Sequence, residues 1–155
     1  MWMIRRLKEL GADEMDLKEV FEKQIRSVLE FGTPIYTAGI TSEDSQNIER
    51  VQRTAASIIL AENYTSYGEA LEELSLDRLA ERRMTICTDF AKKALKHDKF
   101  STWFVKNEVK VNAKVERTCK EIIVEPTFKP VQTRTKRFRK SPISFLTSLL
   151  NQQTS

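Results

Sequence analysis

Residues 41 to 60 read Thr-Ser-Glu-Asp-Ser-Gln-Asn-Ile-Glu-Arg-Val-Gln-Arg-Thr-Ala-Ala-Ser-Ile-Ile-Leu, and this pattern predicts one long helix. Thr41 and Asp44 have the spacing of a capping box, and the acidic first turn suits the positive end of the helix dipole. At about 100° per residue, one stripe is apolar and is expected to face a core. Its members are Ile48, Val51, Ala55, Ile58 and Ile59. The opposite stripe carries Arg50 and Arg53, so the helix offers a core face and a cationic face.

Further helices are predicted on both sides of this one, at residues 2–10, 14–30, 66–74 and 78–96. Gly32 and Pro34 end the second of them, and residues 35–36 are expected to form a short buried connector. Trp103 and Phe104 are expected to form an apolar plug at the end of the helical body. Arg83 falls within the apolar arc of 78–96, where it either extends to solvent at a domain edge or pairs with an acid such as Glu30 or Glu73.

Few helix breakers and the repeated apolar spacing indicate an all-α protein, a small helical bundle followed by an irregular basic C-terminal tail. We predict a helical domain over 1–104, an irregular connector or short hairpin over 105–128, and a largely extended tail over 129–155. From Ser141 the tail is expected to form a short amphipathic helix. No capping signal precedes Trp2, so we expect a larger domain upstream.

The positive charge is unevenly distributed along the chain. Residues 1–125 hold 20 basic and 22 acidic side chains, a net charge of −2, whereas 126–155 hold six basic side chains and no acid. The six are Lys129, Arg134, Lys136, Arg137, Arg139 and Lys140. Cations interleaved with Phe138 suit phosphate contacts combined with stacking, and a nuclear-import signal is the other interpretation.

Motifs of catalysis are absent from the sequence. It contains no glycine-rich phosphate loop, no histidine pair and no nucleophile elbow, so we predict no catalytic residue, metal site or cofactor. Cys87 is expected to be a small core residue, and His97 a charge at a helix end. No signal peptide and no apolar run near ~18 residues is present, which indicates a nuclear or cytoplasmic protein with reduced thiols and no membrane span.

An ordered set of short runs resembles the C-terminal region of reverse transcriptases from LINE-type, jockey-like non-LTR retrotransposons. The runs are residues 2–11, 27–36, 40–41, 48–55, 58–59, 66–74, 76–83, 90–93, 103–104, 134–138, 141–143 and 149–151. Each run is short, and their order over nearly the whole chain makes the resemblance specific.

The resemblance implies a thumb and C-terminal segment that grips a primer–template duplex, RNA–DNA or DNA, next to an upstream palm and fingers. In that family the catalytic aspartates lie in the palm, and this chain has no Asp-Asp pair, so no polymerase chemistry carries over. The matched Arg50 and Arg53 and the tail cations Arg134, Lys136, Arg137, Arg139 and Lys140 become the candidates for backbone contacts. The alternative is a helical module that binds a protein or self-associates through the face that the palm would cover.

Overall fold

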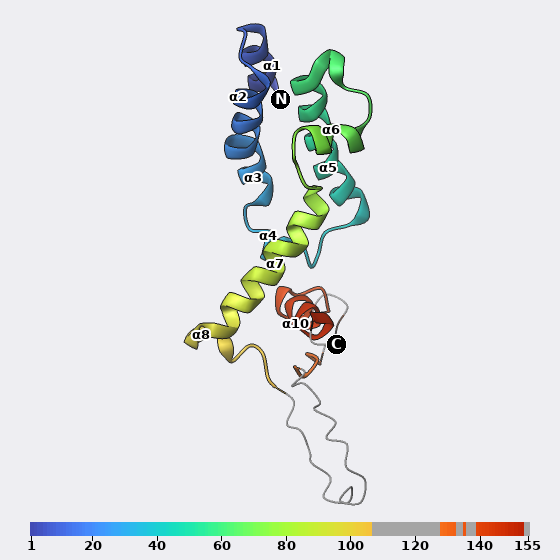
Figure 1. Cartoon of the computed structure of the whole chain (residues 1–155). Coiled ribbons are helices and arrows are strands. Elements are labelled where there is room, and N and C mark those ends of the chain that lie inside the picture. Colours follow the sequence, from blue (N-terminus) through green and yellow to red (C-terminus); the bar gives the residue numbers. More distant parts are fainter. Residues whose placement is uncertain (107–127, 133–134, 136–138, 154–155) are drawn as a thin grey trace, which may run out of the picture. The chain divides into compact units, whose positions relative to one another are not determined.

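The computed structural model describes residues 1–106, 128–132, 135 and 139–153 (Figure 1). Its regular elements are all helical within these residues, which confirms the all-α class. The chain divides into two compact units, Met1–Ile86 (unit 1) and Cys87–Ser155 (unit 2), and the division falls inside helix α7 (Leu79–Lys96). The predicted boundaries at 104 and 128 stay a prediction, and the residues of the predicted hairpin lie outside the described part.

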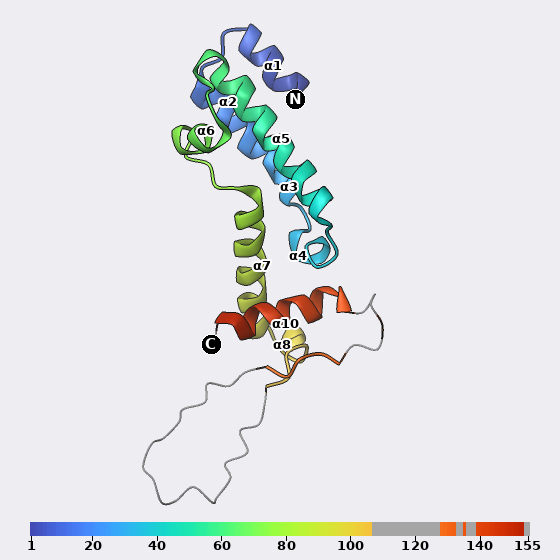
Figure 2. The ribbon, with the colours of Figure 1, turned by 90° about the vertical axis from the view of Figure 1, so that its right-hand side faces the viewer.

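Unit 1 is organised around helix α5 (Ser42–Leu60). Helices α1 (Trp2–Glu9), α2 (Glu14–Val20) and α6 (Tyr67–Glu73) all pack on it (Figure 2). The predicted capping box is present, because the Asp44 N–H donates to Thr41 Oγ1 at 3.1 Å and Asp44 Oδ2 accepts from the Thr41 N–H at 3.4 Å. At the other end, the Lys8 ammonium donates to the carbonyls of Ile58 and Ile59, which places a cation at the negative end of the helix dipole.

The core face of α5 is rotated from the predicted stripe. Ala55 and Ile59 are fully buried as expected, while Ile48, Val51 and Ile58 are only half-buried. Their place in the core is taken by Gln52, Ala56 and Leu60. The buried Gln52 is tolerated because its amide nitrogen donates to Tyr67 Oη at 3.1 Å and to the Asp77 carbonyl at 2.9 Å.

The predicted helix at 14–30 is one continuous helical run built from α2, a π-helical segment (Phe21–Arg26) and α3 (Ser27–Glu30). Gly32 ends it with φ +69°, as predicted from the sequence. The predicted buried connector is wrong, because residues Thr33–Tyr36 form a short helix, α4, and Ile35 is 72% exposed. Pro34 fits the first turn of a helix, where a missing N–H costs nothing.

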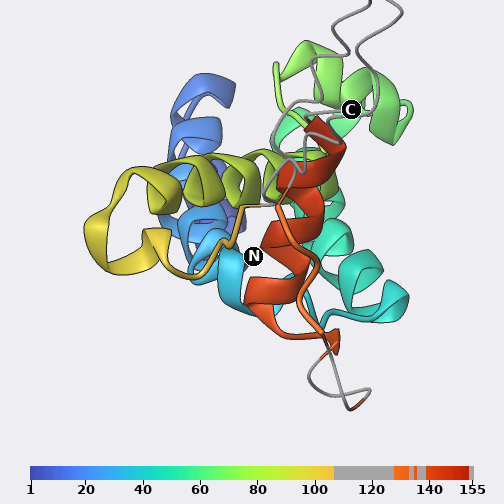
Figure 3. The ribbon, with the colours of Figure 1, turned by 90° about the horizontal axis from the view of Figure 1, so that it is seen from below.

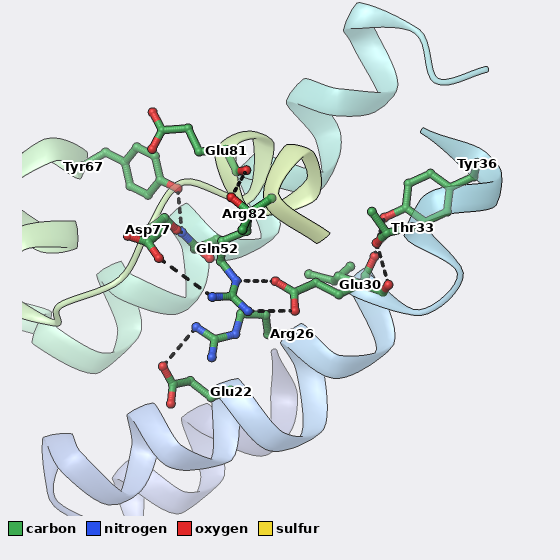
Figure 4. A network of polar contacts seen from close by, with 12 residues as sticks. Glu22, Arg26, Glu30, Thr33, Tyr36, Gln52, Tyr67, Asp77, Glu81 and Arg82 are labelled. Atoms are coloured by element: carbon green, nitrogen blue, oxygen red, sulfur yellow. Dashed lines mark hydrogen bonds and ion pairs between the residues drawn. The ribbon is translucent and has the colours of Figure 1, made fainter. Parts of the chain in front are cut away.

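A polar network joins the α2–α3 run to the start of α7 (Figure 4). Arg82 donates from Nε and Nη2 to the two carboxylate oxygens of Glu30 at 2.5 and 3.1 Å, and this pairing raises the pKa of the Arg82 guanidinium. Arg26 pairs with Glu22 at 3.0 Å beside it. Neither predicted role of Arg83 holds, because Arg83 is 3% exposed and donates to the Ser45 hydroxyl at 2.5 Å.

Unit 2 combines the C-terminal half of α7 with α8 (Asp98–Ser101) and α10 (Pro142–Gln153). Helix α10, which confirms the predicted terminal helix, crosses the C-terminal half of α7 (Figure 3). The core contains Cys87, Ala91, Ala94, Phe104, Phe128, Leu146, Leu149 and Leu150. Cys87 is thus a core residue, as predicted. The Asn151 amide fixes Phe128 by bonding both its N–H and its carbonyl, at 2.8 and 3.0 Å.

The predicted Trp103–Phe104 plug is only half correct. Phe104 is buried against the Phe128 ring, with centroids 6.1 Å apart, whereas Trp103 is 38% exposed. His97 follows the end of α7 and caps α8, since its Nδ1 accepts from the Lys99 N–H at 3.2 Å. Of the adjacent Trp103 and Phe104, only Phe104 belongs to the core of unit 2, and the Trp103 ring lies at the surface.

Candidate nucleic-acid interface

The predicted cationic face of α5 is present in unit 1. Arg50 and Arg53 are three residues apart and both exposed; Arg50 points away from the buried Ala55 and Ala56, whereas Arg53 flanks the core face, three positions before Ala56. Arg50 makes no ion pair among the described residues, so its guanidinium can reach a phosphate. The face is small, because it offers two cations on one helix.

Arg53 is already engaged by a neighbour. Its guanidinium carbon lies 5.0 Å from the centroid of the Tyr67 ring, a cation–π contact. The Tyr67 hydroxyl donates to Glu49 Oε1 at 2.5 Å and accepts from Gln52. Burial is the main cause that raises the pKa of Tyr67 well above its ordinary value, followed by the hydrogen bond to Glu49 and the charge of that carboxylate. A phosphate at Arg53 would therefore lie near the Glu49 side chain, which shares Tyr67 with Arg53.

The predicted tail cations are placed only in part. Arg139 and Lys140 are exposed immediately before α10, and the Arg139 N–H donates to the Thr135 carbonyl at 3.1 Å. Arg134, Lys136 and Arg137 lie outside the described residues. The structure thus brings Arg50 together with Arg53 in unit 1, and Arg139 together with Lys140 in unit 2.

A lysine cluster in unit 2 was missed in the sequence. Lys92, Lys93 and Lys96 fall within an arc of about 100° on α7, and the buried Ala91 and Ala94 lie on the other side of the helix. Lys99, Lys106 and Lys129 are also exposed in unit 2. The signal was available as a charge count: residues 1–86 hold 11 basic and 16 acidic side chains, a net charge of −5, and residues 87–155 hold 15 and 6, a net charge of +9. A count over residues 1–125 and 126–155 places the lysines of α7 in the first group, where the acids of unit 1 cancel their charge.

The cations of the two units differ in their partners. In the part of the chain that the structure describes, all ion pairs lie in unit 1 and involve Arg6, Lys23, Arg26 and Arg82. None of the lysines of α7 and α8 has a carboxylate within ion-pair distance there. When unpaired surface cations neutralise phosphates, the counterions condensed on the nucleic acid are released, and this release is the main driving force of non-specific binding.

Other kinds of site are not apparent among the described residues. They hold no group of three metal-ligating side chains. A hollow of about 270 Å³, lined by Arg5, Lys8, Glu9 and Ile58, is open to solvent, and its lysine is already bonded to α5. No helix in the described ranges is long and apolar enough to cross a membrane. Comparison of the chain with known protein families, with curated proteins and with solved structures finds no match.

Proposed function

We propose that this chain is the thumb and C-terminal region of a LINE-type, jockey-like non-LTR retrotransposon reverse transcriptase, and that it binds the backbone of a primer–template duplex. The observation that carries the binding proposal is the net charge of +9 in unit 2, with exposed lysines on α7 and α8 that lack ion-pair partners among the described residues. The family origin is supported by the ordered runs of the sequence, and an all-α chain is compatible with a thumb.

The proposed activity is binding without chemistry. No Asp-Asp pair occurs in the chain, so the nucleotidyl transfer of the family would require the palm and fingers of the parent protein. The phosphate-contacting residues are proposed to be Arg50 and Arg53, the tail cations at 134, 136, 137, 139 and 140, and Lys92, Lys93, Lys96 and Lys99 of unit 2. A nuclear or cytoplasmic location follows from this partner.

The salt dependence of duplex binding tests the proposal. Fluorescence anisotropy with a labelled RNA–DNA duplex should give a slope of log association constant against log salt of about −0.9 for each phosphate neutralised, which is about −4 if four or five of the proposed cations contact phosphates at the same time. Replacing Lys92, Lys93, Lys96 and Lys99 by Gln should reduce the magnitude of that slope by roughly 1 for each phosphate that is no longer neutralised. An association constant of the wild-type chain that does not change with salt concentration would contradict the proposal.

The matched variant in unit 1 replaces Arg50 and Arg53 by Gln and should change the slope less, because Arg53 already contacts Tyr67. A third variant, with the tail cations Lys136, Arg137, Arg139 and Lys140 replaced by Gln, separates the tail from the α7 lysines. If the tail variant alone loses binding, the lysines of α7 and α8 have no part in it. Far-UV circular dichroism of each variant checks that its helices remain.

A second candidate function, self-association or protein binding, is favoured by the exposed apolar residues of unit 1. Trp2, Leu10, Met15, Val28, Phe31 and Ile35 are each more than two-thirds exposed. Sedimentation velocity over a range of concentrations, without nucleic acid, measures this directly. A dimer that forms while duplex binding is absent would favour this second function over the first.

A further inference from the structure

Three aromatic rings of unit 2 form a column in which neighbouring rings are tilted against each other, with Phe100 between the exposed His97 and Trp103. The ring centroids of His97 and Phe100 are 4.8 Å apart, and those of Phe100 and Trp103 are also 4.8 Å apart. The three residues recur at intervals of three: His97 is the N-cap of the short helix α8, Phe100 lies within it, and Trp103 directly follows its C-cap. Phe100 is half-buried against the unit 2 core, whereas Trp103 is 38% exposed. The Trp103 ring thus has an exposed area, and the Phe100 ring beside it packs on the core of unit 2.

Trp103 is held in place from both sides. Phe100 precedes it and packs on the core, and Phe104 follows it and is 4% exposed. The next residue, Val105, accepts from the Lys129 N–H at 2.7 Å, and Lys106 forms an antiparallel bridge with Phe128. A ring fixed in this way loses little conformational entropy when a ligand binds.

The described part of unit 2, to which Trp103 belongs, carries an excess of cations. In the part of unit 2 that the structure describes, the basic side chains are Lys92, Lys93, Lys96, Lys99, Lys106, Lys129, Arg139 and Lys140, and the acidic ones are Asp89 and Asp98. Lys99 precedes Trp103 by four residues and Lys106 follows it by three. A cationic peptide is disfavoured by this charge, although a lone exposed tryptophan would otherwise attract one.

We propose that Trp103 is a stacking platform for an unpaired nucleobase, with the neighbouring lysines contacting the phosphates on either side of it. An unpaired base presents both of its faces for stacking and carries an anionic backbone, so it satisfies the apolar ring and the cations together. Bases inside a duplex are stacked on each other and cannot reach the ring. The occupant is therefore a single strand or the overhang of a duplex, and the inference rests on the proposed function.

Tryptophan fluorescence provides the test, since the chain contains two tryptophans and only one lies in unit 2. The W2F chain leaves Trp103 as the sole emitter. A single-stranded oligonucleotide of about 12 nucleotides should quench its emission to saturation, while a blunt duplex should bind without comparable quenching. The W103A chain should bind the single strand about 5- to 150-fold more weakly, with an unchanged salt slope. W103F should retain most of the affinity.

The matched control is W2A, which removes an equally large exposed ring from unit 1 and should leave affinity unchanged. If W103A binds the single strand as tightly as wild type, or if Trp103 emission does not change on binding, the stacking inference is wrong while duplex binding stands. If neither single strand nor duplex binds the wild-type chain, the proposed function and the inference both fail. The quenching experiment keeps the native Trp103, so it does not depend on how W103A folds.

Discussion

The two units use their charges in opposite ways. Unit 1 has a net charge of −5, and several of its cations make internal contacts: Arg82 with Glu30, Arg26 with Glu22, Arg53 over Tyr67 and Lys8 on the last carbonyls of α5. Unit 2 has a net charge of +9, and its lysines on α7 and α8 form no ion pair among the described residues. Charges that hold helices together are not free to bind a ligand. We therefore expect Arg26 and Arg82 of unit 1 to contribute mainly to stability, and Arg50 and the lysines of unit 2 to be more available for the proposed phosphate contacts.

The uncharged surfaces differ as well. The exposed apolar residues of unit 1 are spread over α1 to α4, and they include Trp2, Leu10, Val28 and Phe31. In unit 2 the exposed Trp103 belongs to a packed column of rings. An exposed aromatic ring that packs on a second ring, in a unit with excess cations, suits a nucleobase, whereas the exposed apolar side chains of unit 1 suit a protein surface.

The largest effect is expected from a cavity in the core of unit 1. Phe21 is completely buried, and Phe21→Ala should lower the free energy of unfolding by about 3–5 kcal/mol. Phe31→Ala is the matched control, because Phe31 is 84% exposed and its loss should change stability by less than about 0.5 kcal/mol. Urea denaturation followed by circular dichroism measures both.

The same cavity variant tests whether the two units are separate. Hydrogen exchange measured by mass spectrometry should accelerate in α1, α2, α5 and α6 of the Phe21→Ala chain and stay slow in α10. Equal acceleration in α10 would mean that the units unfold as one cooperative block. The division at Ile86 would then not separate two parts that unfold independently.

A smaller loss is expected when the cation of a half-buried pair is removed. Arg82→Met leaves the Glu30 carboxylate without its bidentate partner, with the Glu30 side chain 16% exposed, and should cost about 1–3 kcal/mol. The exposed Arg78→Met is the control and should be close to neutral. Adding Glu30→Gln to Arg82→Met should restore part of the loss, because it removes the unpaired charge. Equal stability of the Arg82 and Arg78 variants would show that the pair contributes nothing.

Local signals in the sequence predicted the helices well. Thr41 with Asp44 marks the start of α5, and Gly32 marks the end of α3, because capping and positive φ depend on residues within one turn. Positions that depend on distant partners could not be predicted. Gln52 is buried because Tyr67 and Asp77, 15 and 25 residues later, receive its hydrogen bonds. The helical periodicity of residues 41–60 contains no information about these later partners.

Adjacent residues of similar type were the hardest to assign. Glu30 was one of two acids considered as a partner of Arg83, but it pairs with Arg82, and the neighbouring Arg83 donates to Ser45. One position rotates a side chain by about 100°, so the choice depends on where the partner helices lie. Trp103 and Phe104 pose the same problem, since Phe128 decides which ring is buried. The candidate cations of α5, Arg50 and Arg53, were predicted from periodicity, while the charge excess of unit 2 becomes visible only when the charge is counted from where that unit begins.

Alkaline pH should weaken unit 1 through Tyr67. Burial and Glu49 raise the pKa of this phenol in the folded state, so its contribution is fully present below the unfolded pKa of about 10 and is lost as pH rises above it. The expected slope is at most about 1.4 kcal/mol per pH unit, since one proton is involved. Tyr67→Phe should flatten this part of the pH profile, measured by urea denaturation between about pH 9 and 11. Tyr64→Phe leaves the Glu49–Tyr67–Gln52 contacts intact, so this variant should lose stability at alkaline pH as the wild-type chain does.

The smallest effect concerns the one buried guanidinium of unit 1 that pairs with a hydroxyl instead of a carboxylate. Arg83 donates to Ser45, and its Nη1 has no partner among the described residues. Ser45→Asp should place a carboxylate there and stabilise the fold by about 0.5–1 kcal/mol, because charge-assisted hydrogen bonds are stronger than neutral ones. Ser42→Asp lies nearer the N-terminus of the same helix and gains only the dipole term, about 0.3 kcal/mol. If Ser42→Asp stabilises as much as Ser45→Asp, the gain comes from the helix dipole and Arg83 does not sense the new charge.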